Sequence, residues 1–100
     1  NLGWHQRALA VTEEAVAIHR HLAVGRPDAF EPYLAQTLGN LSEHFLPFDR
    51  QTDSIASAEE GITLLTPHHT SHSYAHQELM DRLNDTLAKA RAGNGNGDAP

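Results

Sequence analysis

The chain has 100 residues, of which 39% are hydrophobic and 6% aromatic, so it has the length of one domain with a core of aliphatic side chains. Thirteen acidic residues against seven Lys and Arg give a net charge of −6, which excludes the basic surface needed to bind nucleic acid. No cysteine is present and the apolar runs are short, so we expect no disulfide, no thiol catalysis and no membrane span. These features favour a cytoplasmic protein.

The first predicted helix spans about residues 4–24, which contain no proline and end before Gly25-Arg26-Pro27. It carries one apolar row, Ala8, Val11, Ala15, Ile18 and Leu22, and a second row, Leu9, Val16 and Ala23. A chain starting with Asn1 rather than Met suggests the C-terminal fragment of a larger protein, with one side of this helix left bare. We therefore expect the chain to form a homodimer through this helix.

A second helix is predicted over about residues 29–46. Asp28 and Glu31 have the spacing of a capping box, and Pro32 suits the first turn. Its apolar stripe is formed by side chains at steps of four, three and four, namely Leu34, Leu38, Leu41 and Phe45. Pro47 is expected to end this helix.

The third helix is predicted over about residues 51–65 and closes at Thr66-Pro67. Its small residues Ser54, Ala58 and Gly61 would let two helix backbones approach closely, so the second and third helices should form an antiparallel hairpin. A last helix over about residues 71–92 carries Leu79, Met80, Leu83 and Leu87. The glycine-rich residues 93–100 predict a disordered tail.

The chain also repeats itself. A shift of 46 residues places Glu13-Glu14-Ala15-Val16 on Glu59-Glu60-Gly61-Ile62, which relates the first and third helices. A shift of 42 residues relates the second and fourth helices by placing Leu38, Leu41 and Phe45 on Met80, Leu83 and Leu87. Two copies of a two-helix unit, out of phase with the chain ends, therefore account for the ordered region.

These units resemble the tetratricopeptide repeat. The first-helix pattern of that family is matched by Leu38-x-x-Leu41-Ser42-x-x-Phe45, and the second-helix pattern by Ser54-x-x-x-Ala58-x-x-Gly61. Units of about 46 residues resemble the long-unit bacterial variety, although Leu38 replaces the tryptophan of the family. The resemblance implies an all-α fold in which antiparallel hairpins stack as a right-handed superhelical solenoid of about four helices.

The resemblance further implies a protein-interaction scaffold or sensor within a larger regulatory or signalling protein, with no catalysis and no cofactor. The groove residues implied by the repeat register are Gln36, Asn40, Glu43, Glu78, Asp81, Arg82 and Asp85. Because this set is mostly acidic and lacks the basic pair that clamps a C-terminal carboxylate, a basic or amphipathic protein segment is the expected partner. The same residues are also what ordinary solvated helix faces would carry.

Two alternatives remain open. A structural four-helix module that self-associates would bury the first helix fully within one chain. A metal-responsive module would use three of the eight histidines, His68, His72 and His76, which stand four residues apart and would share one face of a helix. A polar loop with exposed histidines explains the same spacing without a metal. The pairs Glu13-Glu14 and Glu59-Glu60 lack a neighbouring nucleophile, so no enzyme is expected.

Overall fold

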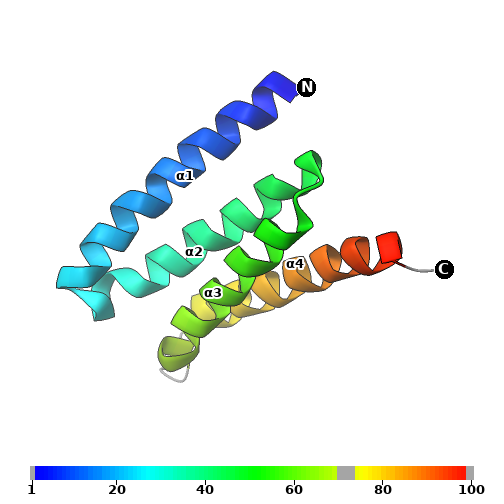
Figure 1. The fold of residues 1–100 in the computed structure, drawn as a ribbon. Coiled ribbons are helices and arrows are strands. Elements are labelled where there is room, and N and C mark those ends of the chain that lie inside the picture. The colour runs from blue at the N-terminus through cyan, green and yellow to red at the C-terminus, as the bar shows by residue number, and fades with distance from the viewer. Residues whose placement is uncertain (1, 70–73, 99–100) are drawn as a thin grey trace.

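The computed structural model describes residues 2–69 and 74–98. Within these two stretches the chain is α-helical and contains no β-strand (Figure 1). The elements are α1 (Leu2–Gly25), α2 (Pro27–Phe45), the short 3₁₀ helix η1 (Leu46–Phe48), α3 (Gln51–His69) and α4 (Tyr74–Asp98). The predicted all-α fold of four helices is confirmed.

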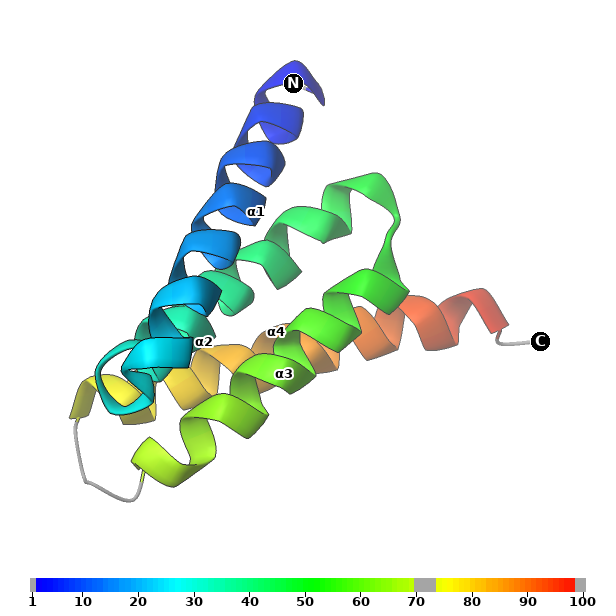
Figure 2. The same cartoon turned by 60° about the vertical axis from the view of Figure 1, so that its left-hand side comes forward.

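Successive helices run antiparallel, and α2 contacts each of the other three (Figures 1 and 2). The α2–α3 pair is the hairpin that was predicted between residues 29 and 65. α4 follows α3 back and also touches α2, whereas the N-terminal half of α1 stands apart from α3 and α4 (Figure 2). α2 is therefore the centre of the fold.

α2 begins two residues earlier than predicted, and the predicted capping box is wrong. The helix starts at Pro27, and the carbonyl of Arg26 accepts bonds from the amides of Ala29 (3.2 Å) and Phe30 (3.1 Å). Among the described residues, no side chain caps this end. Proline suits the first helical position because its φ is already helical and its missing N–H needs no partner there. Asp28 and Glu31 are thereby left free of a capping role.

The ends of α3 and α4 also differ from the prediction. α3 continues through Pro67 to His69, since a proline in the last turn forfeits only one helical hydrogen bond. The hydroxyl of Thr66 donates to the carbonyl of Ile62 (2.6 Å) in the same turn. α4 is described from Tyr74, and it extends to Asp98 where a tail without regular structure was predicted from residue 93. The side chain of Gln51 lies beside Gly93, so the start of α3 supports the first residue of this extension.

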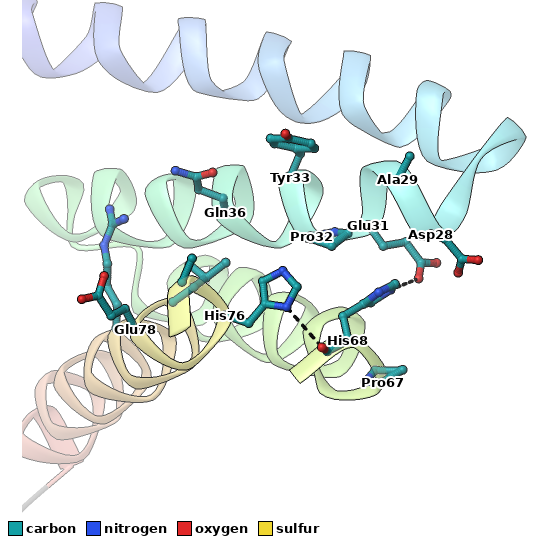
Figure 3. A pocket seen from close by; sticks show the side chains of 13 residues that line it. Asp28, Ala29, Glu31, Pro32, Tyr33, Gln36, Pro67, His68, His76 and Glu78 are labelled. Carbon is teal, nitrogen blue, oxygen red and sulfur yellow. Dashed lines mark hydrogen bonds and ion pairs between the residues drawn. The ribbon is translucent and has the colours of Figure 1, made fainter. Parts of the chain in front are cut away.

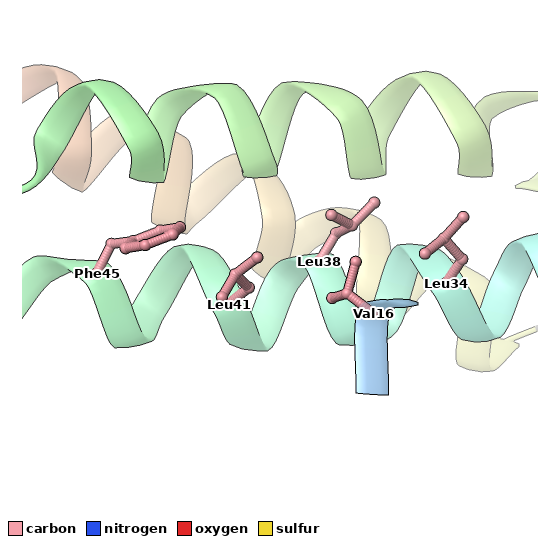
Figure 4. Packing of buried hydrophobic residues seen from close by; sticks show 5 residues of the cluster. All are labelled: Val16, Leu34, Leu38, Leu41 and Phe45. Atoms are coloured by element: carbon pink, nitrogen blue, oxygen red, sulfur yellow. The ribbon is translucent and has the colours of Figure 1, made fainter. Parts of the chain in front are cut away.

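Two clusters of buried side chains hold the helices together. The first lies between α1 and α2 and consists of Val16, Leu34, Leu38, Leu41 and Phe45 (Figure 4). The second joins α2, α3 and α4 through Ala35, Leu65 and Leu83. Leu64 packs against both clusters and so connects them. The predicted stripe of α2 is thus the buried face of the central helix.

Small residues set the close packing of α3, as predicted. Ser54 and Ala58 are fully buried, and Gly61 lies against Leu83 of α4. The hydroxyl of Ser42 donates to the carbonyl of Ser54 (2.6 Å), and the hydroxyl of Ser54 donates to the carbonyl of Ser42 (2.8 Å). This reciprocal pair satisfies both buried hydroxyls and fixes how α2 crosses α3.

Candidate binding surface

A hollow of about 1020 Å³ opens where the first half of α2 meets the end of α3 and the start of α4 (Figure 3). We call it the α2–α4 hollow. It is lined by Asp28, Ala29, Glu31, Pro32, Tyr33, Gln36, Pro67, His68, Ala75, His76, Glu78, Leu79 and Arg82. Its volume is at the upper end of the range typical of ligand pockets, which suits an extended partner better than a small molecule.

The structure brings five of the seven predicted groove residues together. Gln36, Glu78 and Arg82 line the hollow, while Asn40 and Glu43 adjoin it through Arg82. These residues come from α2 and α4, which lie next to each other although their sequence positions are about 40 residues apart. The residues that the repeat register selected on α2 and at the start of α4 are therefore neighbours in the structure.

Arg82 holds α4 to α2. Its guanidinium donates to both carboxylate oxygens of Glu43 (2.9 and 3.0 Å) and to the side-chain oxygen of Asn40 (2.6 Å). The hydrogen bond from Arg82 is the main cause that lowers the pKa of Glu43, and the same bond raises the pKa of Arg82. Thr86 adds a longer bond to Glu43 (3.4 Å). Arg82 is thus engaged within the chain and does not offer a free positive charge to the hollow.

The depressed pKa of Glu43 predicts a pH dependence of stability. The stabilisation by Arg82 is complete above 4.5, the ordinary pKa of this carboxyl, and is lost as the pH falls through the lower pKa of the folded state. Glu43→Gln should therefore lower stability at neutral pH, and its difference from the wild type should shrink below pH 4.5. Urea denaturation across this range measures the effect, with Glu13→Gln on the exposed side of α1 as the control. A difference that is constant with pH would contradict it.

The other two predicted groove residues lie outside the hollow. Asp81 accepts a hydrogen bond from Gln77 (2.8 Å), and Asp85 pairs with Lys89 at 3.2 Å, one turn further along α4. Both contacts are exposed pairs within a single helix, which contribute little to stability. The structure gives neither residue a place in the hollow.

Residues that the sequence did not assign to the site complete it. Asp28 and Glu31 were interpreted as helix caps, but they lie on the wall of the hollow with Tyr33, whose residue surface is 56% exposed. Tyr33 also stacks on His19 of α1, with ring centroids 6.1 Å apart. The spacing of these residues in the sequence could not assign them to the site, because their place on the wall of the hollow depends on where α3 ends relative to α2.

Two of the three predicted metal ligands reach the hollow in another arrangement. Nε2 of His68 is 3.0 Å from Oε1 of Glu31, and Nδ1 of His76 donates to the carbonyl of His68 at 3.1 Å (Figure 3). His72 lies outside the described residues. His68 belongs to α3 and His76 to α4, so these two histidines do not share one face of a single helix. In residues 2–69 and 74–98, no group of three His, Asp or Glu side chains could hold a metal ion.

The adjacent glutamates of α3, Glu59 and Glu60, form ion pairs with other helices. Glu59 accepts a hydrogen bond from Arg91 of α4 (2.8 Å), and Glu60 accepts two from Arg20 of α1, one of them at 3.0 Å. The hydrogen bond to Glu60 is the largest cause that raises the pKa of Arg20. These ion pairs join α3 to α4, against which it packs, and to α1, on the surface of the molecule.

Comparison with protein-family models, with curated proteins and with solved structures finds no match to this chain. Among the helices described, none is both long enough and apolar enough to cross a membrane.

Proposed function

We propose that the chain is a protein-interaction module of the tetratricopeptide type, whose α2–α4 hollow binds a basic or amphipathic segment of a partner protein. The observation that carries this proposal is the charge of the hollow. Asp28, Glu31 and Glu78 line it, with Glu31 lying 3.0 Å from Nε2 of His68. Arg82, the one arginine among the described lining residues, is paired with Glu43. A partner with Lys or Arg side chains would complement these carboxylates.

The arrangement of the helices supports the repeat assignment. α2 and α3 form the antiparallel hairpin of one unit, with α1 packed on α2 and α4 packed on α3. The two helices that match at a shift of 42 residues, α2 and α4, lie on either side of the hollow (Figure 3). In a stack of such hairpins each unit contacts its neighbours and leaves one row of helices open to a ligand. On this proposal, further units of a larger regulatory or signalling protein extend the same surface as a right-handed superhelix.

The hollow combines charge with apolar surface. Pro32, Ala75 and Leu79 provide apolar contacts between the carboxylates. A Lys or Arg side chain could lay its aliphatic stem along this surface and place its charged head at Glu78. An amphipathic helix is therefore a better match than a uniformly charged chain.

Charge reversal in the hollow tests the proposal. The probe is a fluorescein-labelled amphipathic helix of leucine and lysine, and its affinity is measured by fluorescence anisotropy. We expect Glu78→Lys to weaken binding about tenfold, which corresponds to about 1.4 kcal/mol for a like charge placed against the ligand. The matched control is Glu13→Lys, because it makes the same change of net charge on an exposed residue of α1.

Two results would contradict the proposal. One is equal affinity of the wild type for a peptide in which every lysine is replaced by glutamate. The other is an equal loss for Glu78→Lys and Glu13→Lys, since that would mean the peptide responds to the net charge of −6 and not to the hollow.

A further inference from the structure

α1 has two apolar faces, and residues 2–69 and 74–98 cover only one of them. Leu9, Val16 and Ala23 pack against α2. The adjacent face carries large side chains that remain open to solvent: Trp4 is 69% exposed, Val11 66%, Ile18 54% and Leu22 38%. The full burial expected of α1 in a four-helix bundle is therefore not found. Such a contiguous exposed apolar patch marks an interaction site.

The apolar residues of this open face have the spacing that is found where two helices pack side by side. Including two alanines between the large residues, the apolar positions alternate in steps of four and three, as in the seam of a coiled coil. The members of this seam are Trp4, Ala8, Val11, Ala15, Ile18 and Leu22. A single helix running along α1 would contact all of them.

The seam is symmetric about residue 13. If a second copy of α1 runs antiparallel with this centre, Ala8 faces Ile18 of the other copy and Val11 faces Ala15. In these inner pairs a larger side chain lies against alanine, which limits voids between the two helices, while Trp4 faces Leu22 at each end of the seam. A parallel pair would place alanine against alanine and tryptophan against tryptophan. The side-chain volumes thus favour the antiparallel pair.

The surface area that this open face could bury against a second copy is that of a weak dimer. A buried tryptophan contributes about 150–250 Å² and an aliphatic side chain roughly 100 Å². Scaled by their exposed fractions, the four large side chains of both copies would bury on the order of 600 Å² of apolar surface. Homodimer interfaces are about 65% apolar, so the total is about 900 Å². This is close to the lower limit of about 1,000 Å² for a specific interface.

We infer that the open face of α1 binds a second copy of this chain, with the two α1 helices antiparallel and centred on residue 13. Glu14 of each copy flanks the seam beside its equivalent, and Arg7 lies near His21 of the other copy. The exposed glutamate pair opposes the dimer only slightly, because solvent screens it. This surface is separate from the α2–α4 hollow, so the two proposals can fail independently.

Sedimentation equilibrium of the 100-residue chain tests the association. We expect a dimer that dissociates with a constant on the order of 10⁻⁵–10⁻⁴ M. Ile18→Glu should weaken it at least tenfold by placing a charge in the seam. Ala17→Glu adds the same side chain to the exposed face beside it and should leave the association unchanged. Circular dichroism of each variant shows whether the helices persist.

Cysteine cross-linking tests the direction, since the natural chain has no cysteine. A mixture of Ala8→Cys and Ile18→Cys chains should form the mixed disulfide, whereas Ala8→Cys alone should not, because its two copies would lie about 15 Å apart along the helix. Ala10→Cys, on the outer surface, is the matched control. A wild-type chain that stays monomeric up to about 1 mM would overturn the inference. Efficient self-linking of Ala8→Cys would overturn it too.

Discussion

Leu83→Ala should lower the free energy of unfolding by about 2–5 kcal/mol. Leu83 is fully buried on α4 and packs between Gly39 of α2 and Gly61 of α3, so its side chain joins three helices. Truncation would leave a cavity that backbone atoms on two sides cannot close. A domain of this size has a total stability of about 5–15 kcal/mol, so the loss would be visible in urea denaturation followed by circular dichroism.

The matched control is Leu22→Ala on the open face of α1, measured in dilute solution where the chain is monomeric. Leu22 is 38% exposed, and the same truncation should cost much less there. A loss below about 1 kcal/mol for Leu83→Ala would mean that α4 does not pack on α2 and α3 as described.

Gly61→Val should lower the free energy of unfolding by about 1–3 kcal/mol. A Cβ at Gly61 would lie 2.9 Å from Cδ2 of Leu83 and 3.3 Å from the carbonyl oxygen of Ala35. The leucine could turn aside, but the backbone of α2 could not, so α3 would have to move away from it. The higher helix propensity of valine offsets only a few tenths of a kcal/mol.

Gly25→Ala is the control, because a Cβ at Gly25 would meet no other element of the described residues within 4 Å, and stability should stay the same or rise. The double variant Gly61→Val/Leu83→Ala should be less destabilised than the sum of the single variants, since the shorter side chain makes room for the valine. Strict additivity would show that the two residues are not in contact.

Local sequence patterns were sufficient to predict the four helices and the buried face of α2. The steps of four and three residues in α2 identified Leu34, Leu38, Leu41 and Phe45, all of which are buried. Pro47 marked the end of α2, which terminates at Phe45. These features follow from helix geometry and from the missing N–H of proline, which act within a few residues and are therefore readable in the sequence.

The predictions that failed depend on packing between distant segments. Asp28 and Glu31 have the spacing of a capping box, but a proline one residue earlier starts the helix and leaves both side chains on the wall of the hollow. α3 passes through Pro67, which brings His68 to Glu31. Neither the spacing of the residues nor the composition of the chain indicates that the start of α2 and the end of α3 lie side by side.

The hollow was predictable only in part, for the same reason. The repeat register selected both Glu43 of α2 and Arg82 of α4, and the structure joins these two side chains by hydrogen bonds. The register could not distinguish Arg82 from Asp81 and Asp85, which also lie on α4 but interact with Gln77 and Lys89. Such a distinction requires the rotation of α4 about its axis, which is set by the burial of Leu83.

Backbone-amide NMR tests the central claim most directly. The isotope-labelled chain is titrated with the leucine–lysine amphipathic peptide at a concentration where α1 does not self-associate. We predict saturable shifts for residues of the α2–α4 hollow, including Tyr33, Gln36 and Glu78, with the exposed face of α1 unchanged. Shifts confined to α1, or the absence of saturable shifts in α2 and α4, would contradict a binding site in the hollow.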